Sequence, residues 1–241
     1  MADRLFIIIP AYNEEENIRQ VVADWYPIAE KYGSDSRLVV IDDGSSDNTY
    51  GILRQLEETM PLLTALTKQN GGHGATLLYG YKYALDNGAD YVFQTDSDGQ
   101  TLPSEFEPFW KSRTKYDISI GYRNKRRDGL MRIFVTKILR LVVYICFRIY
   151  VLDANTPYRL MSADTLKENL RFIPDDFFLS NVAVCAIYKK RHQKVHFIPI
   201  SFRPRQGGVN SINIFKIIKV GFASIRSFIV INDKVEATTR M

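Results

Sequence analysis

Cysteine and histidine are scarce in this sequence, which argues against two kinds of cross-linked scaffold. The 241 residues include two cysteines, Cys146 and Cys185, and three histidines. The cysteines lie far apart, and neither has a Cys or His neighbour at metal-ligand spacing. The sequence therefore predicts neither a disulfide framework nor a zinc site, and its composition fits a reducing, cytosolic setting.

Long uncharged apolar runs are missing as well. The apolar run at residues 5–9 is too short for a signal peptide and is predicted to be a β-strand. The longest apolar stretch, residues 131–151, is interrupted by Lys137, Arg140 and Arg148. Because a charge in mid-bilayer costs about 2.5–3.5 kcal/mol, we expect no transmembrane helix.

Charge is divided unevenly along the chain. Residues 1–110 hold 7 Lys/Arg and 18 Asp/Glu, a net charge of −11, whereas residues 111–241 hold 25 and 9, a net charge of +16. This division suggests that the first half handles a cation and a nucleotide and that the second meets an anion. Ordinary segregated surface charge is the alternative. Nucleic acid is not the expected anion, because no known nucleic-acid-binding signature is present.

The first half alternates β-branched runs with amphipathic segments. We expect strands at 5–9, 38–41, 62–66 and 91–95 and helices at 15–30, 48–58 and 74–87. This alternation predicts an α/β fold with a Rossmann-like, mostly parallel sheet that carries helices on both faces. Such sheets bind ligands at the carboxyl ends of their strands.

The second half begins with a predicted helix to about residue 115 and a strand at 117–121. Residues 131–151 and 212–231 follow as two amphipathic segments with basic faces. We interpret them as helices that lie in a membrane interface, and two core-packed helices are the alternative. The expected organisation is a catalytic domain over 1–210, which includes the first interfacial helix, and an amphipathic helix and tail over 211–241.

Two carboxylates follow the strand expected at 91–95. Residues 95–100 read Thr-Asp-Ser-Asp-Gly-Gln, so Asp96 and Asp98 can converge on one hard cation, and the amide oxygen of Gln100 can join them. Mg²⁺ or Mn²⁺ held there would neutralise a departing diphosphate. The same residues are also an ordinary turn composition.

Three other loops belong to the same pattern. Residues 9–15 read Ile-Pro-Ala-Tyr-Asn-Glu-Glu, residues 40–47 read Val-Ile-Asp-Asp-Gly-Ser-Ser-Asp, and residues 70–74 read Asn-Gly-Gly-His-Gly. Together with the Asp-Ser-Asp segment, they resemble an inverting family 2 glycosyltransferase of the GT-A fold, especially the dolichyl- or polyprenyl-phosphate sugar synthases. The resemblance runs from about residue 5 to residue 215.

The resemblance implies roles for residues on the donor side. Pro10 and Tyr12 would wall the nucleoside, with Glu14 near the ribose. Asp42 or Asp43 would accept a hydrogen bond from the base. Three residues, Asn70, Gly72 and Gly74, would let the backbone approach the nucleotide closely. Uracil and guanine both satisfy such a site, so a UDP-sugar or a GDP-sugar is the expected donor.

It also implies roles on the acceptor side. Arg123, Arg132 and Thr136 would receive an acceptor phosphate, for which guanidinium groups offer paired donors at fixed charge. Asp153 would orient the site, and Arg205 would contact the diphosphate.

One departure from the family favours a phosphate acceptor. Relatives often carry an acid after a Phe-Phe pair, whereas Phe177 and Phe178 are followed here by Leu-Ser-Asn181. A hydroxyl acceptor needs a general base, and a phosphate oxygen does not. Asp175 and Asp176 could serve as that base and keep the alternative open.

The sequence therefore predicts a metal-dependent transferase that passes a sugar, with inversion, to undecaprenyl or dolichyl phosphate. We expect it at an anionic membrane surface on the cytoplasmic face, with oligomeric state open. One alternative is a soluble cytoplasmic family 2 enzyme acting on a saccharide hydroxyl in polysaccharide or lipopolysaccharide synthesis. A third, weaker hypothesis is a non-catalytic sugar-nucleotide-binding module.

Overall fold

A computed structural model describes residues 3–32, 35–123, 130–203 and 214–239. Within these ranges it describes all side chains except those of residues 123, 130–136, 214–223 and 239. In chain order the strands are β1 (Leu5–Ala11), β2 (Arg37–Asp42), β3 (Leu63–Thr67), β4 (Tyr91–Gln94), β5 (Ile118–Arg123), β6 (Arg159–Ser162) and β7 (Val195–Ile200). The helices are α1 (Ile18–Lys31), α2 (Thr49–Glu57), α3 (His73–Asp86), α4 (Glu107–Ser112), α5 (Leu130–Phe147), α6 (Ala163–Leu170), α7 (Ser180–Lys190) and α8 (Ile214–Thr239).

The seven strands form one sheet in the order β3-β2-β1-β4-β6-β5-β7. The neighbours β3, β2, β1 and β4 are parallel, and so are β5 and β7. Strand β6 runs antiparallel to both β4 and β5. The predicted mostly parallel sheet is confirmed, and β6 divides it into a four-stranded half and a two-stranded half.

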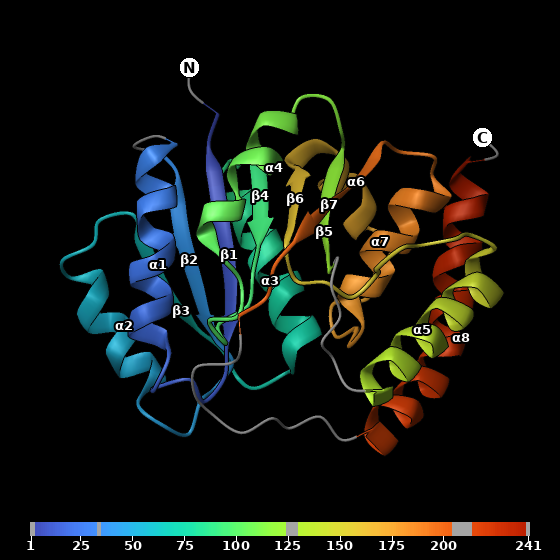
Figure 1. Ribbon diagram of the computed structural model, residues 1–241, viewed down its shortest axis with the longest axis horizontal. Helices are drawn as coiled ribbons and strands as arrows, with labels where there is room; N and C mark the ends of the chain where they lie inside the picture. Colours follow the sequence, from blue (N-terminus) through green and yellow to red (C-terminus); the bar gives the residue numbers. More distant parts are fainter. Residues whose placement is uncertain (1–2, 33–34, 124–129, 204–213, 240–241) are drawn as a thin grey trace.

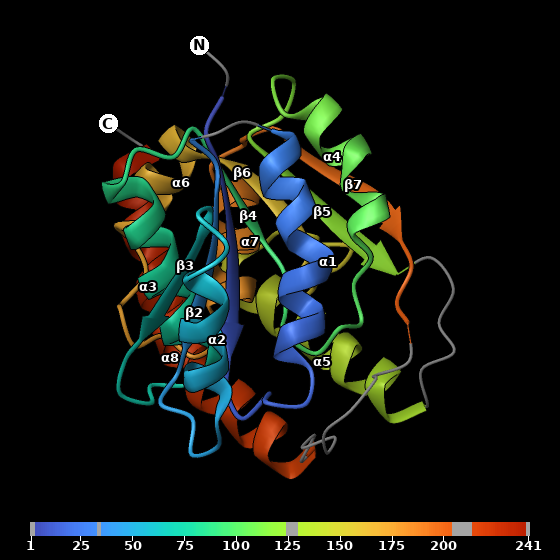
Figure 2. The ribbon, with the colours of Figure 1, turned by 90° about the vertical axis from the view of Figure 1, so that its left-hand side faces the viewer.

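Side chains alternate across β1 and feed two hydrophobic cores. Leu5, Ile7 and Ile9 pack with α1, α2 and α4, whereas Phe6 and Ile8 pack with α3, α6 and α7. Every residue of β1 is buried, as expected for a strand covered on both faces. Figures 1 and 2 show these two helical layers on opposite faces of the sheet.

Helices α5 and α8 lie side by side beyond α7 (Figure 1). The Phe228 ring of α8 packs edge-on against Phe147 of α5 at 5.7 Å between centroids and against Phe177 at 5.3 Å. Phe228, Ile231 and Val235 are buried in the same core as α7. Helix α8 is thus attached to the sheet domain through the C-terminal half of the helix.

Two predicted elements have different bounds. The helix expected up to residue 115 is divided into a 3₁₀ turn at Pro103–Glu105 and α4, where Pro108 stands in the first turn. Helix α8 continues to Thr239, beyond the expected end at 231, because buried Val235 extends its apolar face. In the part of the chain that the structure describes, no helix combines the length and the apolar character needed to cross a bilayer.

Candidate active site

Four parallel strands deliver their following loops to one edge of the sheet. The β1 and β2 loops are joined by hydrogen bonds: Asn13 N–H donates to Ser45 Oγ at 2.9 Å, and Ser46 N–H donates to Asn13 Oδ1 at 2.8 Å. Asn13 has a φ of 53°, a conformation that asparagine tolerates better than most residues. These bonds fix the first two loops relative to each other.

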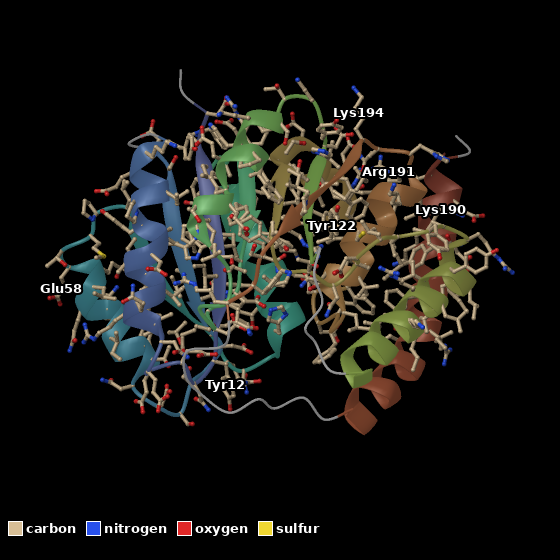
Figure 3. All side chains as sticks on the ribbon, viewed as in Figure 1. Tyr12, Glu58, Tyr122, Lys190, Arg191 and Lys194 are labelled. Atoms are coloured by element: carbon tan, nitrogen blue, oxygen red, sulfur yellow. The ribbon has the colours of Figure 1, made fainter. Side chains whose placement is uncertain are left out.

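The β1 loop presents one exposed aromatic ring. The Tyr12 side chain is 50% exposed although it directly follows a buried strand, and Figure 3 shows it at the lower rim of the molecule. Pro10 is buried within β1. Glu14 is buried too, and its Oε2 accepts a hydrogen bond of 2.7 Å from Asn17 Nδ2. The loop thus exposes the ring of Tyr12 to solvent and keeps the carboxylate of Glu14 buried.

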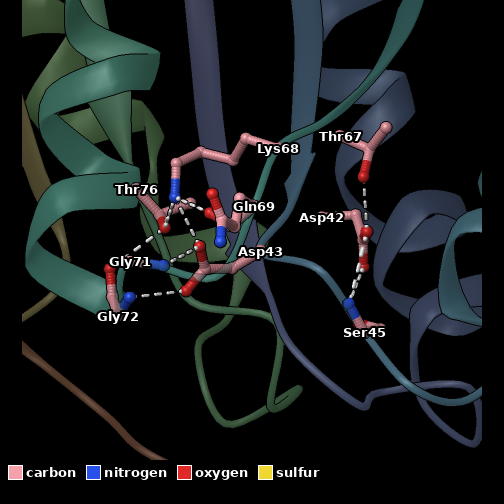
Figure 4. Close-up of polar contacts among 9 residues, drawn as sticks. All are labelled: Asp42, Asp43, Ser45, Thr67, Lys68, Gln69, Gly71, Gly72 and Thr76. Carbon is pink, nitrogen blue, oxygen red and sulfur yellow. Dashed lines mark hydrogen bonds and ion pairs between the residues drawn. The ribbon is translucent and has the colours of Figure 1, made fainter.

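Asp42 and Asp43 occupy different surroundings at the end of β2 (Figure 4). Asp42 accepts hydrogen bonds from the Thr67 hydroxyl at 2.8 Å and from Ser45 N–H at 3.2 Å. Both aspartates are at most 3% exposed. Asp42 therefore joins β2 to the neighbouring strand β3 and to its own loop.

The carboxylate of Asp43 organises the loop before α3. Lys68 Nζ lies 2.6 Å from Oδ1, Gly71 N–H donates to Oδ1 at 2.9 Å, and Gly72 N–H donates to Oδ2 at 2.8 Å (Figure 4). Burial raises the pKa of Asp43, but the hydrogen bonds from Lys68 and Gly71 outweigh it and hold the pKa below its usual value. Asp43 is therefore held as an anion against this loop.

Two glycines at the start of α3 are required by geometry, Gly72 just before the helix and Gly74 in its first turn. Gly72 has a φ of 83°, which L side chains rarely adopt. A Cβ at Gly74 would lie 2.2 Å from the carbonyl oxygen of Phe178 and 2.3 Å from that of Phe177. Asn70, at the tip of the loop, is exposed. The loop is therefore packed between Asp43 and the 177–178 backbone.

Asp96 and Asp98 follow β4 at the same edge. Asp98 Oδ1 accepts a 3.0 Å hydrogen bond from Gln100 N–H, which closes the turn. Two hydrogen bonds join Gln100 to Arg203. Gln100 Nε2 donates to the Arg203 carbonyl at 3.1 Å, and Arg203 N–H donates to the Gln100 carbonyl at 2.8 Å. Asp96 lies near the start of α3, where His73 Nε2 is 3.1 Å from its Oδ1.

His73 is the residue that sequence reasoning undervalued. Desolvation by the surrounding protein lowers the pKa of His73, but the negative charge of Asp96 and its hydrogen bond together outweigh that effect, so the net pKa lies above the usual value. The available signal was a histidine between two glycines at the end of a strand. Only the tertiary structure places it against Asp96.

The donor set at this edge suits a hard divalent cation. No group of three His, Cys, Asp or Glu side chains that could hold a metal occurs among the described residues. Mg²⁺ commonly binds through one or two carboxylates and takes its other ligands from substrate phosphates and water. The partly exposed Asp96 and Asp98 fit that mode, with Gln100 in the same turn.

Arg159 is a second residue whose importance the sequence did not reveal. It is fully buried, and its guanidinium donates to the carbonyls of Thr156 at 2.6 Å, Asn181 at 2.9 Å and Ala154 at 3.3 Å. It therefore joins the loop that contains Asp153 to the start of α7. Asp153 Oδ1 accepts a 3.3 Å hydrogen bond from Asn155 N–H.

Four of the predicted acceptor-side residues are not described at the level of side chains. Arg123 ends β5, and Arg132 and Thr136 belong to the first half of α5, but their side chains lie outside the description. Arg205 lies outside the described residues altogether.

Comparison with known proteins identifies the family of the chain. Residues 6–192 match the model of "Glycosyl transferase family 2". The chain is 30% identical over 190 residues, 69% of this chain and 73% of the relative, to the UDP-N-acetylglucosamine–dolichyl-phosphate N-acetylglucosaminyltransferase of Methanococcus voltae. It is 27% identical over 140 residues, 57% of this chain and 40% of the relative, to the undecaprenyl-phosphate 4-deoxy-4-formamido-L-arabinose transferase of Pseudomonas fluorescens.

Solved structures share the fold at low sequence identity. Glucosyl-3-phosphoglycerate synthase from Mycobacterium tuberculosis, in complex with Mn²⁺, UDP-glucose and phosphoglyceric acid, superposes with a TM-score of 0.70 at 16% identity. The alignment covers 96% of this chain and 80% of that one. S. aureus TarS in complex with UDP gives a TM-score of 0.58 at 15% identity, covering 91% and 64%. From the fold and the family match together, we conclude that the chain is a glycosyltransferase of family 2 with the GT-A fold.

Proposed function

We propose that this enzyme transfers a sugar from a nucleoside-diphosphate sugar to a polyprenyl phosphate, with inversion and with the help of Mg²⁺ or Mn²⁺. The observation that carries the proposal is the convergence of four loops at one sheet edge. These loops carry the exposed ring of Tyr12, the glycine loop whose N–H groups bind the Asp43 carboxylate, and the partly exposed carboxylates of Asp96 and Asp98. The relatives named for dolichyl-phosphate and undecaprenyl-phosphate substrates support this acceptor class.

On the donor side, the exposed Tyr12 ring and Pro10 would wall the nucleoside, with Glu14 near the ribose and Asp42 or Asp43 accepting from the base. The backbone at Asn70, Gly72 and Gly74 would approach the nucleotide closely. Asp96, Asp98 and Gln100 would hold the divalent ion, which supplies positive charge against the leaving diphosphate. Arg205 would contact that diphosphate.

On the acceptor side, Arg123, Arg132 and Thr136 would receive the phosphate, and Asp153 would orient the site. A phosphate monoester is already largely anionic at pH 7, since its second pKa is about 6. Its oxygen can therefore attack the anomeric carbon without a general base. Attack opposite the departing diphosphate forms the new C–O bond as the old one breaks, and the anomeric centre is inverted.

The outer face of the α5–α8 pair suits the surface of a membrane. Among the side chains of this pair that the structure describes, the exposed apolar ones include Leu141, Tyr144 and Ile145 on α5 and Ile229 and Val230 on α8. Exposed cations accompany them, namely Lys137, Arg148 and Arg226. Apolar side chains flanked by cations are typical of helices that lie on anionic lipid. This surface supports binding to a membrane, which we propose to be at its cytoplasmic face.

A second candidate function is transfer to a saccharide hydroxyl. It needs a general base, and Asp175 and Asp176 are the candidates named from the sequence. Asp175 forms an ion pair with Lys82, which engages one of its oxygens.

The test is to incubate the enzyme with radiolabelled UDP-, GDP- or dTDP-sugars, Mn²⁺ and undecaprenyl or dolichyl phosphate, and then to extract with organic solvent. We expect label from one donor in the organic phase. Label confined to the aqueous phase, with activity on saccharide hydroxyls, would refute the lipid acceptor. A non-catalytic module would transfer no label to any acceptor.

A further inference from the structure

Phe178 is an exposed aromatic residue beside the donor loop. Its side chain is 49% exposed, and two of its ring carbons lie 3.8 and 3.9 Å from the position of a Cβ built on Gly72. The ring therefore lies against the loop whose N–H groups bind Asp43. Single exposed apolar side chains are common, so the surroundings of Phe178 decide what its exposure means.

The backbone that carries Phe178 is closely held. Its carbonyl oxygen and that of Phe177 press against Gly74 so closely that no Cβ fits there. The Phe177 ring packs against Phe228 of α8 at 5.3 Å between centroids. Phe178 is thus presented to solvent by a segment fixed on two sides.

The segment after Phe178 has unused polar atoms. Helix α7 begins at Ser180, and Ser180 Oγ and Asn181 Oδ1 are buried with no hydrogen-bond partner among the described residues. The Arg159 guanidinium donates a hydrogen bond to the Asn181 carbonyl at 2.9 Å. Buried polar atoms without partners are costly, and in a binding site a ligand or a water molecule can satisfy them.

Phe178 lies between the donor loop and the apolar helix pair. On one side it contacts Gly72, and on the other its neighbour Phe177 contacts α8, where Ile229 and Val230 follow Phe228 and are exposed. In the proposed function, an acceptor that approached the Gly72 loop from the α5–α8 pair would meet this ring. Burial against a phenyl ring removes more apolar surface from water for the isoprenoid chain of a lipid acceptor than for a hydroxyl-rich sugar.

We propose that Phe178 is a specificity-determining residue for the acceptor, and that its ring contacts the isoprenoid unit next to the phosphate. This inference rests on the proposed function and names the part of the lipid that this position recognises. Removing the ring weakens acceptor binding and leaves donor binding intact.

The test uses farnesyl phosphate, which is short enough to separate this contact from membrane binding. Loss of the ring in Phe178→Ala should raise the KM for farnesyl phosphate about tenfold and change kcat less than about twofold. Phe178→Leu keeps apolar bulk and should stay within about threefold of the wild type. Tyr79→Ala, which removes another exposed ring, is the matched control, and its KM should equal that of the wild type.

Donor binding is measured in parallel as the Kd of the UDP- or GDP-sugar with Mn²⁺, which should not change in Phe178→Ala. An unchanged KM for farnesyl phosphate, or a donor Kd that rises by the same factor, would overturn the inference. If the wild-type enzyme labels no polyprenyl phosphate at all, the proposed function itself fails. A wild type that is active beside an unaffected Phe178→Ala variant refutes this inference alone.

Discussion

Asp43 accounts for much of the local order at the donor edge. Its carboxylate receives two backbone N–H groups and the Lys68 ammonium, and so it ties the end of β2 to the loop before α3. Hydrogen bonds to a buried carboxylate stabilise its charged form, which makes the contribution of this residue dependent on pH.

Asp43→Asn should therefore reveal a pH-dependent loss of stability. The folded pKa of Asp43 lies below that of the unfolded chain, about 3.9. Its contribution is thus present above pH 4 and is lost as pH falls through the folded value. We expect the variant to be less stable by about 1–3 kcal/mol at pH 6, with the difference shrinking below pH 4. Urea unfolding followed by the fluorescence of buried Trp25 measures it, and a constant difference would contradict the ion pair.

The approach of Gly74 to the 177–178 backbone gives a second prediction. In Gly74→Ala the new Cβ meets two carbonyl oxygens, so the free energy of unfolding should fall by about 1–3 kcal/mol. Gly71→Ala is the matched control, because its Cβ would meet only the flexible end of Lys68 at 3.0 Å and Ala75 Cβ at 3.4 Å. Equal stability of the two variants by thermal unfolding would show that the loop moves freely.

Asp98→Asn tests the role proposed for the carboxylates. Because the amide keeps the shape of the side chain but removes its charge, sugar transfer should fall on the order of 100-fold or more. The melting temperature without ligand should stay close to that of the wild type. Transfer is measured with saturating Mn²⁺, and activity retained without the charge would remove Asp98 from the metal site.

Helices α5 and α8 each have one side buried in the core and another side exposed to solvent. Val143 and Phe147 of α5 are buried against α7 and α8, while Leu141, Tyr144 and Ile145 face outward. The core contacts hold the pair in place, so changes on its outer face should leave folding intact. Membrane binding can therefore be tested separately from stability.

Replacing Leu141, Tyr144 and Ile145 with serine should weaken binding to phosphatidylglycerol vesicles by about tenfold or more, because apolar burial drives interfacial binding. Vesicle co-sedimentation measures this, with neutral phosphatidylcholine vesicles as the reference for charge. Transfer to short, water-soluble farnesyl phosphate should remain. Unchanged vesicle binding would place the membrane surface elsewhere on the molecule.

In the proposed function, the topology of the whole molecule separates the nucleotide site from the acceptor site. The four parallel strands carry the donor loops, and the antiparallel strand β6 introduces the half that bears α5, α7 and α8 (Figure 1). Figure 3 shows Tyr12 at the lower rim of the molecule and Lys194 at the opposite end.

A ligand that bridges the donor loops should stabilise the whole fold. UDP or GDP with Mn²⁺ at about 100 times its Kd should add about 2.7 kcal/mol, which corresponds to a rise in Tm of roughly 5–10 °C for a chain of this size. Differential scanning fluorimetry measures it, with EDTA added in place of Mn²⁺ as control. An equal rise with EDTA would argue against a metal-bridged diphosphate.

The sequence by itself determined the fold class, and it predicted which loops share one edge of the sheet. Strand and helix periods identified β1 to β4 and α1 to α3 because these elements are covered on both faces or amphipathic. The residues at their carboxyl ends then had to share an edge, because parallel neighbouring strands point the same way. The sequence could not predict that Asp42 and Asp43 have different hydrogen-bond partners, because the two residues are adjacent, identical in type and both buried.

Only the tertiary structure decided which distant residues meet. His73 reaches Asp96, Arg159 joins the Asp153 loop to α7, and Phe178 lies on Gly72. These contacts span 22 to 106 residues and depend on how the helices pack on the sheet, which no local period encodes. Local sequence pattern fixes which backbone elements form, whereas side-chain contacts between them arise only when the two cores close around the sheet.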